Sequence, residues 1–202
     1  MKFASLSRPM FTLFLIICIG CTSLSGSNFH FTGDETELLI GDDELPPQWK
    51  LETTGEQPLR NGTGWTRIYT NSDSHDRGII SNGVTIFDQY EDAIEYWTAF
   101  EELERGYSRP PCINPPKEYK SEIANDFKVF CIDSDGLVGI FAYEYFILAR
   151  YGNVVTTFSA VAVNEPDMTV TQASEVGVLR WAEMEALLKR IDERFEEARK
   201  TR

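Results

Sequence analysis

The sequence predicts an α+β fold in which an antiparallel sheet carries two main helices on one face. Two observations lead to this prediction. Short alternating or β-branched segments occur together before residue 88 and again after residue 126, and each group is followed by one long amphipathic stretch. Strands that are segregated from helices in this way favour an antiparallel sheet over a doubly wound parallel one.

The first 20 residues have the pattern of a signal peptide. Lys2 and Arg8 are the only charged residues before Cys21, and they are followed by an apolar run at residues 10–19. A helix that crosses a membrane needs about 20 apolar residues, so this shorter run is typical of an export signal. The sequence therefore predicts export of the folded part.

The end of that run, Gly20-Cys21, resembles the lipobox of bacterial lipoproteins, in which a small residue precedes an obligatory cysteine. The resemblance implies that Cys21 receives diacylglycerol and becomes the new N-terminus, although Cys18 stands where the family prefers leucine. Two acyl chains give firm anchoring, whereas one binds only marginally. We therefore expect the protein in the cell envelope, on the extracytoplasmic side of a membrane. An ordinary secretory signal, which would release a soluble protein, is the alternative.

Net charge excludes several classes of partner. The chain has 19 basic and 32 acidic residues, and removal of residues 1–20 leaves 17 basic against 32 acidic, a net charge of −15. Such a protein repels phosphate backbones and anionic lipid headgroups. We therefore expect no nucleic-acid partner, and membrane contact through the lipid anchor only.

Residues 21–46 are expected to form a flexible acidic tether. Ser and Gly dominate residues 22–27, acidic residues follow, and no Lys or Arg occurs between Cys21 and Lys50. Polar, like-charged stretches bury too little apolar surface to become ordered. Leu38-Leu39-Ile40 is the exception, which we expect to dock as a short edge segment. Residues 47–202 are long enough for a single domain with one core.

The elements of this domain follow in order. Residues 49–52, 65–69 and 83–87 predict strands. A capping box at Asp88 and Glu91 begins a helix that ends near Gly106, with apolar residues on one face. Prolines make residues 110–116 extended. Residues 127–132, 137–150 and 154–163 predict further strands, and an amphipathic stretch from about 171 to 198 predicts the closing helix.

The best-defined unit is the hairpin around Gly152-Asn153. A two-residue loop of this composition favours a primed turn. It places Tyr151 opposite Val154 and Ile147 opposite Phe158.

Two cysteines, Cys112 and Cys131, remain after the signal and the lipid site, and we expect them to form a disulfide. Paired cysteines are usual outside the cytoplasm, and closing a loop of about 20 residues contributes about 3 kcal/mol in the chain-entropy model. Two free thiols or a metal site are the alternatives. Neither His30 nor His75 lies near either cysteine in sequence, so we expect no metal site and no cofactor.

Three patterns resemble chemical sites but favour solvated structure. Asp133-Ser134-Asp135-Gly136 lacks the continuation of a calcium loop, because an apolar strand follows it. His75 lies among serines and aspartates, but neighbours within one loop do not form a catalytic triad. The acidic residues from Glu91 to Glu104 fit the wet face of a helix better than a glycosidase carboxylate pair. We assign no catalytic residue.

The assembly resembles a diffuse group of uncharacterised exported bacterial lipoproteins with a small sensor-like or PsbP-like domain. Short stretches carry the resemblance: Leu45 to Trp49, the helix from Asp92 to Phe100, the hairpin from Arg150 to Val155, and Arg190 to Phe195. It implies no established activity and no functional residue.

We therefore expect a non-enzymatic binding or accessory domain. It would bind a protein or small ligand on the exposed sheet face or in a groove between sheet and helix. A small extracytoplasmic hydrolase with a site assembled by the fold is the alternative.

Overall fold

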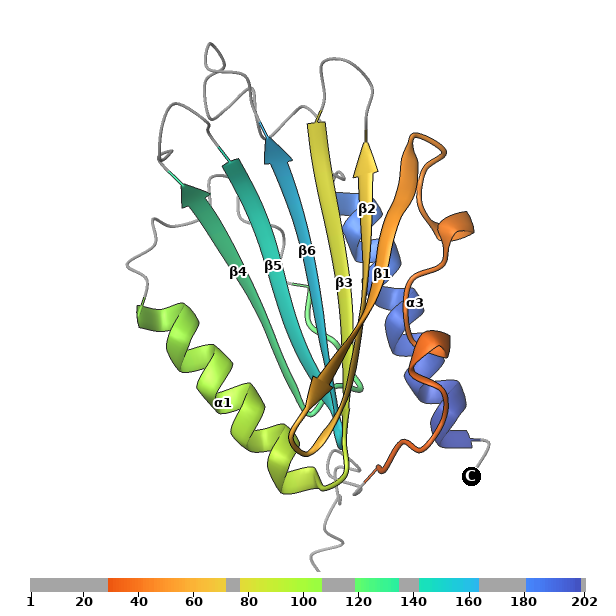
Figure 1. Cartoon of the computed structure of the whole chain (residues 1–202), viewed down its shortest axis with the longest axis vertical. Coiled ribbons are helices and arrows are strands. Elements are labelled where there is room, and N and C mark those ends of the chain that lie inside the picture. The colour runs from red at the N-terminus through yellow and green to blue at the C-terminus, as the bar shows by residue number, and fades with distance from the viewer. Residues whose placement is uncertain (1–28, 72–76, 107–118, 135–141, 164–180, 201–202) are drawn as a thin grey trace, which may run out of the picture.

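The computed structural model describes residues 29–71, 77–106, 119–134, 142–163 and 181–200. Six strands form one antiparallel sheet in the order β1-β2-β3-β6-β5-β4 (Figure 1). These strands are β1 (Trp49–Leu59), β2 (Gly62–Asn71), β3 (Arg77–Phe87), β4 (Asp126–Ser134), β5 (Ala142–Tyr151) and β6 (Val154–Val163). The predicted α+β class and the antiparallel sheet are confirmed.

The long helices of the described ranges are α1 (Tyr90–Gly106) and α3 (Trp181–Lys200). The helix predicted after Asp88 is present and ends at Gly106, as expected, and the capping box at Asp88 and Glu91 stays a prediction. Residues 171–180, where the closing helix was expected to begin, lie outside the described part. Neither of the two helices is long and apolar enough to cross a membrane.

The helices lie on opposite faces of the sheet, so the expectation that both pack on one face is wrong (Figure 1). Alternate residues of β5 belong to different cores. Ile147 and Ala149 pack with α3, whereas Leu148 packs with Ala93 and Trp97 of α1. Successive side chains of a strand point to opposite faces, and both rows of β5 contain buried apolar residues. A strand of this composition is buried on both sides, as in a sheet between two layers of helix.

The hairpin between β5 and β6 has the predicted register, with Tyr151 opposite Val154 and Ile147 opposite Phe158. Gly152 has a φ of 64°, in the left-handed region that a primed turn requires. A Cβ atom at this position would lie 1.8 Å from the carbonyl oxygen of Phe29. Glycine is therefore required here both for its backbone conformation and for this close approach.

Residues 29–46, which we call the N-terminal strap, are packed into the core rather than free. The expectation of a flexible tether over residues 21–46 is therefore wrong from residue 29 onward. Two short 3₁₀ helices, Glu35–Glu37 and Asp42–Glu44, carry acidic side chains; most of these face solvent, but Glu44 is largely buried and pairs with Arg194 of α3. Between and beside them, six apolar side chains are buried in the core that contains α3: Phe29, Phe31, Leu38, Leu39, Ile40 and Leu45.

The backbone of the strap is held by side chains instead of by a neighbouring strand. Asn82 of β3 is fully buried, and its Oδ1 accepts a hydrogen bond from the backbone N of Ile40 at 2.8 Å. Tyr69 of β2 donates its hydroxyl to the carbonyl oxygen of Ile40 at 2.6 Å. On the other side, Arg194 of α3 donates to the carbonyl oxygen of Leu39 at 2.6 Å. Leu38-Leu39-Ile40 therefore docks between the sheet and α3, and not at a sheet edge.

At the start of the strap, the side-chain amide of Asn153 forms the two backbone hydrogen bonds that a neighbouring strand would otherwise give Phe31. Its Oδ1 accepts from the backbone N of Phe31 at 2.6 Å, and its Nδ2 donates to the Phe31 carbonyl at 3.1 Å. The same Nδ2 donates to the carbonyl of Phe87 at the end of β3, at 2.7 Å. A buried amide that uses both its donor and its acceptor in this way fixes the strap to the hairpin and to β3.

Gly152→Ala is expected to lower the free energy of unfolding by about 2 kcal/mol or more, because it combines an unfavourable φ with displacement of Phe29. Gly55→Ala is the matched control, because no atom lies within 4 Å of its added Cβ. The control is expected to change stability by less than about 1 kcal/mol. Urea unfolding of both variants measures the difference, and equal stabilities would contradict the account of the turn.

Candidate functional site

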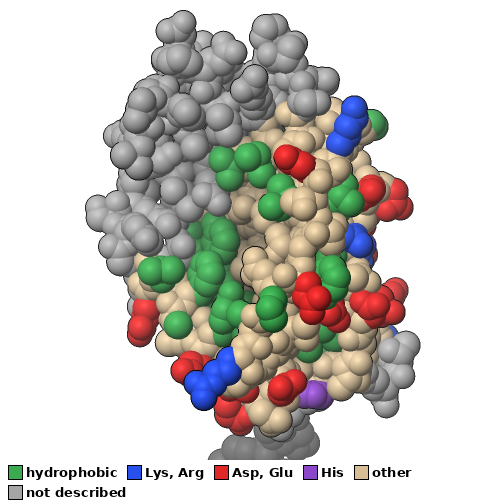
Figure 2. Space-filling model, in the orientation of Figure 1, with side chains coloured by type: hydrophobic (Ala, Val, Ile, Leu, Met, Phe, Trp, Pro, Cys, Tyr) green, Lys and Arg blue, Asp and Glu red, His purple; other side chains and the backbone are tan. Residues whose placement is uncertain are grey.

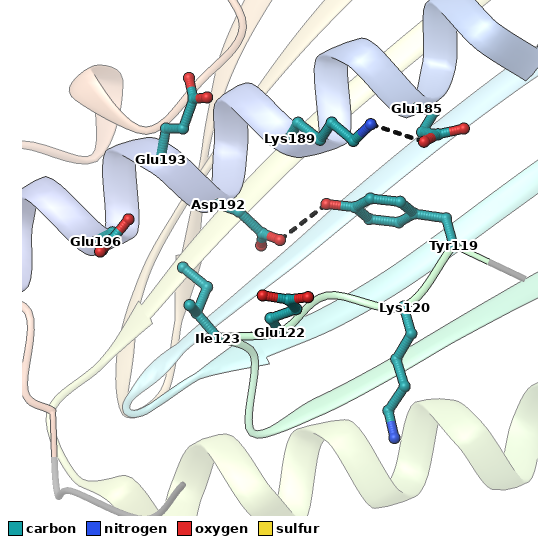
Figure 3. Close-up of a pocket in the computed structure, with 9 residues that line it drawn as sticks. All are labelled: Tyr119, Lys120, Glu122, Ile123, Glu185, Lys189, Asp192, Glu193 and Glu196. Carbon is teal, nitrogen blue, oxygen red and sulfur yellow. Dashed lines mark hydrogen bonds and ion pairs between the residues drawn. The ribbon is translucent and has the colours of Figure 1, made fainter. Parts of the chain in front are cut away.

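An open groove runs between α3 and the segment that precedes β4. It has a volume of about 600 Å³. The face of α3 that lines it presents side chains at helical spacing, from Glu185 to Glu196 (Figure 3). The full lining consists of Tyr119, Lys120, Glu122, Ile123, Glu185, Lys189, Asp192, Glu193 and Glu196. We call this feature the acidic groove.

A hydroxyl–carboxylate cluster forms one wall of the groove. Asp192 of α3 accepts three hydrogen bonds: from the hydroxyl of Tyr119 at 2.8 Å, from Ser121 at 2.7 Å and from Tyr151 of β5 at 2.6 Å. Figure 3 shows Tyr119 and Asp192 pointing toward each other across the groove. Tyr151 also stacks on Phe195 with ring centroids 3.8 Å apart. The cluster therefore links three parts of the chain: α3, the sheet and the segment before β4.

Ser121 continues this link into the loop. Its hydroxyl oxygen accepts hydrogen bonds from the backbone N of Ala124 at 2.9 Å and of Ile123 at 3.3 Å. Asn125 then closes the loop against the hairpin, because its backbone N donates to the carbonyl of Arg150 at 2.7 Å. The loop is thus shaped by its own side chains, and its position on α3 is set by Asp192.

Both tyrosines of the cluster hold their protons tightly. Burial raises the pKa of the Tyr151 hydroxyl well above its usual value, and the negative charge of Asp192 raises it further. Burial and the hydrogen bond to Asp192 likewise raise the pKa of Tyr119. Near neutral pH both hydroxyls are therefore protonated donors, and Asp192 is occupied by them. The cluster therefore holds α3, the sheet and the segment before β4 together through these three hydrogen bonds.

The charged side chains that line the groove give it a negative potential. Five carboxylates line it against the ammonium groups of Lys120 and Lys189. Lys189 is already paired with Glu185 at 2.8 Å, and Glu196 with Lys200 at 2.9 Å. Exposed ion pairs of this kind contribute little to the stability of the fold. They also leave the groove with more carboxylates than ammonium groups, so its potential stays negative. The groove therefore attracts cations and repels phosphate groups.

A metal ion is not favoured by these carboxylates. Within the part of the chain that the structure describes, no group of three or more His, Cys, Asp or Glu side chains is arranged to hold one. Asp192 already accepts hydrogen bonds from three hydroxyl donors.

Several residues singled out in the sequence lie outside the described part. These are Cys21, Cys112 and His75. Cys131 is placed on β4 opposite Tyr145, but its side chain is not described, so the disulfide stays a prediction. His30 lies in the N-terminal strap and has an exposed side chain.

The acidic side of α1 is the wet face of a helix, as predicted. Glu91, Glu95 and Glu102 are exposed. Asp92 accepts a hydrogen bond from Asn61 at 2.9 Å, and Glu101 pairs with Lys128 of β4. On this side of the molecule, acidic side chains are dispersed over the surface (Figure 2). They form no close carboxylate pair among the described contacts.

The sequence did not reveal the hydroxyl–carboxylate cluster. Its members are 119, 121, 151 and 192, which share no local motif. One signal was present: Asp192 follows Ile191 directly and lies three residues before Phe195, at the border of the buried stripe of α3. A carboxylate at such a border needs hydrogen-bond donors from a neighbouring element, but the sequence does not say which.

A search against protein-family models, curated proteins and solved structures found no match to this chain.

The cluster makes stability depend on pH at the alkaline end. Because folding raises the pKa of Tyr151 and Tyr119, the stabilisation is complete below about pH 10, the unfolded value, and is lost as the pH rises above it.

Tyr151→Phe is expected to lower the free energy of unfolding at pH 7 by about 1–3 kcal/mol, through the lost hydrogen bond. Its stability is also expected to fall less steeply above pH 10. Urea unfolding at a series of pH values tests this, and an unchanged slope would contradict it.

Proposed function

We propose that the protein is an exported lipoprotein, held on the extracytoplasmic side of a membrane by a lipid on Cys21, and that its folded domain is a non-enzymatic binding module. The observation that carries this proposal is Gly20-Cys21 at the end of a short apolar run behind Lys2 and Arg8. The mature chain is strongly acidic, so electrostatic attraction does not hold it at a membrane, and the lipid supplies the attachment.

The acidic groove supports the binding role. Its volume of about 600 Å³ is within the range of sites that take small molecules or peptide side chains. One wall is preorganised by Asp192 and its three hydroxyl donors. A wall that does not rearrange reduces the entropy cost of binding. The excess of carboxylates selects a positively charged ligand, such as a basic segment of a protein or a small cation, and disfavours nucleic acid.

Lipidation is tested in a bacterium that expresses the full chain. Cys21→Ala is expected to abolish incorporation of labelled palmitate, because it removes the thiol that carries the diacylglycerol. Cys18→Ala is the matched control, since it removes a thiol three residues earlier and is expected to keep the label. Label retained by Cys21→Ala, or absent from the unmodified chain, would exclude the anchor and leave a secreted soluble protein.

The groove is tested with a short lysine-rich peptide as the probe. Replacement of both Glu193 and Glu196 by Gln is expected to weaken binding about tenfold, because two of the carboxylates facing the ligand are lost. The same replacement at Glu91 and Glu95, which are exposed on α1, changes the net charge equally and is expected to have a much smaller effect. Calorimetric titration measures both. Equal losses would show that the peptide responds to net charge alone and that the groove is not the site.

A further inference from the structure

The point where the chain enters the fold is fixed. Phe29 is 9% exposed, and its ring meets that of Phe195 edge to face at 6.4 Å. The Phe29 ring also contacts Arg199, whose guanidinium lies over it at 5.2 Å from the ring centre. The Phe29 carbonyl is set against the backbone of Gly152. The flexible tether therefore cannot extend beyond residue 28.

This fixed entry point limits the reach of the lipid anchor. Phe29 is eight positions after Cys21, and an extended chain spans at most about 3.3–3.6 Å per position, so the entry point lies within about 28 Å of Cys21. A free tether over residues 21–46 would have reached roughly 90 Å. This step depends on the lipid at Cys21, which is the proposed function.

Several turns meet around the entry point, at what we call the anchor end of the domain. The β5–β6 turn is joined to β3 through the hydrogen bond from the backbone N of Phe87 to the carbonyl of Asn153, at 2.9 Å. The β1–β2 turn is joined to the start of α1 through the bond from the backbone N of Asp88 to the carbonyl of Asn61, at 3.0 Å. Figure 1 shows these turns at the same end of the sheet as the start of the strap.

We infer that the anchor end faces the lipid surface and that the entry point of the domain stays within about 28 Å of the lipid-bearing Cys21, close to its own membrane. The surface it meets is the headgroup layer of that bilayer. The anchor end exposes both signs of charge, with Arg60 beside Asn61 and Asp88 beside the first turn of α1. It therefore does not add the concentrated negative charge that the acidic groove carries.

The inference also restricts the ligand of the acidic groove. Arg199, which covers Phe29, donates to the carbonyl of Ile123 at 3.2 Å, and Ile123 lines the groove. One end of the groove thus begins next to the anchor end, and α3 carries the rest away from it. A ligand that enters the groove is one presented close to the membrane, such as a basic segment at the surface of a membrane protein.

The orientation is tested with the lipidated full chain in phosphatidylcholine vesicles that contain an acceptor-labelled lipid. A fluorescent amino acid is placed at Arg60, near the anchor end, or at Lys50, which is exposed near the other end of β1. The two positions are ten steps apart along β1 and its end, a distance of about 33 Å at the rise of a strand. Energy transfer to the lipid is expected to be several-fold stronger from Arg60 than from Lys50.

Insertion of a Gly-Ser linker of about 20 residues between Asn28 and Phe29 is expected to reduce transfer from Arg60 and to remove most of the difference. Vesicle flotation separates the two levels of the proposal. Protein that does not float with the vesicles contradicts the lipid anchor itself. Protein that floats but shows equal transfer from Arg60 and Lys50 contradicts the orientation while leaving the anchor in place.

Discussion

The structure depends on how the backbone of the N-terminal strap is satisfied inside the core. A chain segment buried between a sheet and a helix has polar groups that water cannot reach, and each group left without a partner costs about 1–3 kcal/mol. The strap adds no strand, so the sheet cannot supply these partners through its ladder. Asn82 and Asn153, both almost fully buried, supply them through their side-chain amides. With these bonds in place, the apolar side chains of the strap can fill the space under α3.

This arrangement makes the two sides of the sheet unequal. The side of α1 has a small core that includes Phe87, Trp97 and Leu148. The side of α3 has three layers, because the strap lies between the helix and part of the sheet, and it also carries the hydroxyl–carboxylate cluster at Asp192. The acidic groove therefore lies on the more elaborate side, whereas the anchor end is an end of the sheet whose turns contact both the strap and the start of α1.

Local patterns in the sequence predicted the elements that local physics determines. The helix after Asp88 has apolar residues at helical spacing, of which Ala93 and Trp97 are buried, and Gly152-Asn153 specifies both a turn and its register. The strap was not predicted, because six acidic residues alternate in groups with its six apolar core residues and concealed their burial. The partners of the strap are remote: Phe31 bonds to Asn153 across 122 positions, and Arg194 to Leu39 across 155. The placement of α3 opposite α1 was missed for a related reason, because both rows of β5 contain apolar residues and neither row identifies the helix that covers it.

Those sequence separations also constrain the order in which the domain folds. Synthesis proceeds from the N-terminus, so the strap is made before β2, β3 and the hairpin, and α3 is made last. Contacts between remote segments form slowly, because the loop between them must close before the contact contributes. Before α3 is synthesised and packed, the apolar side chains of the strap are only partly buried. A folding intermediate with this exposed apolar surface is prone to aggregation and proteolysis. The first part of the domain to be synthesised is therefore among the last to be enclosed.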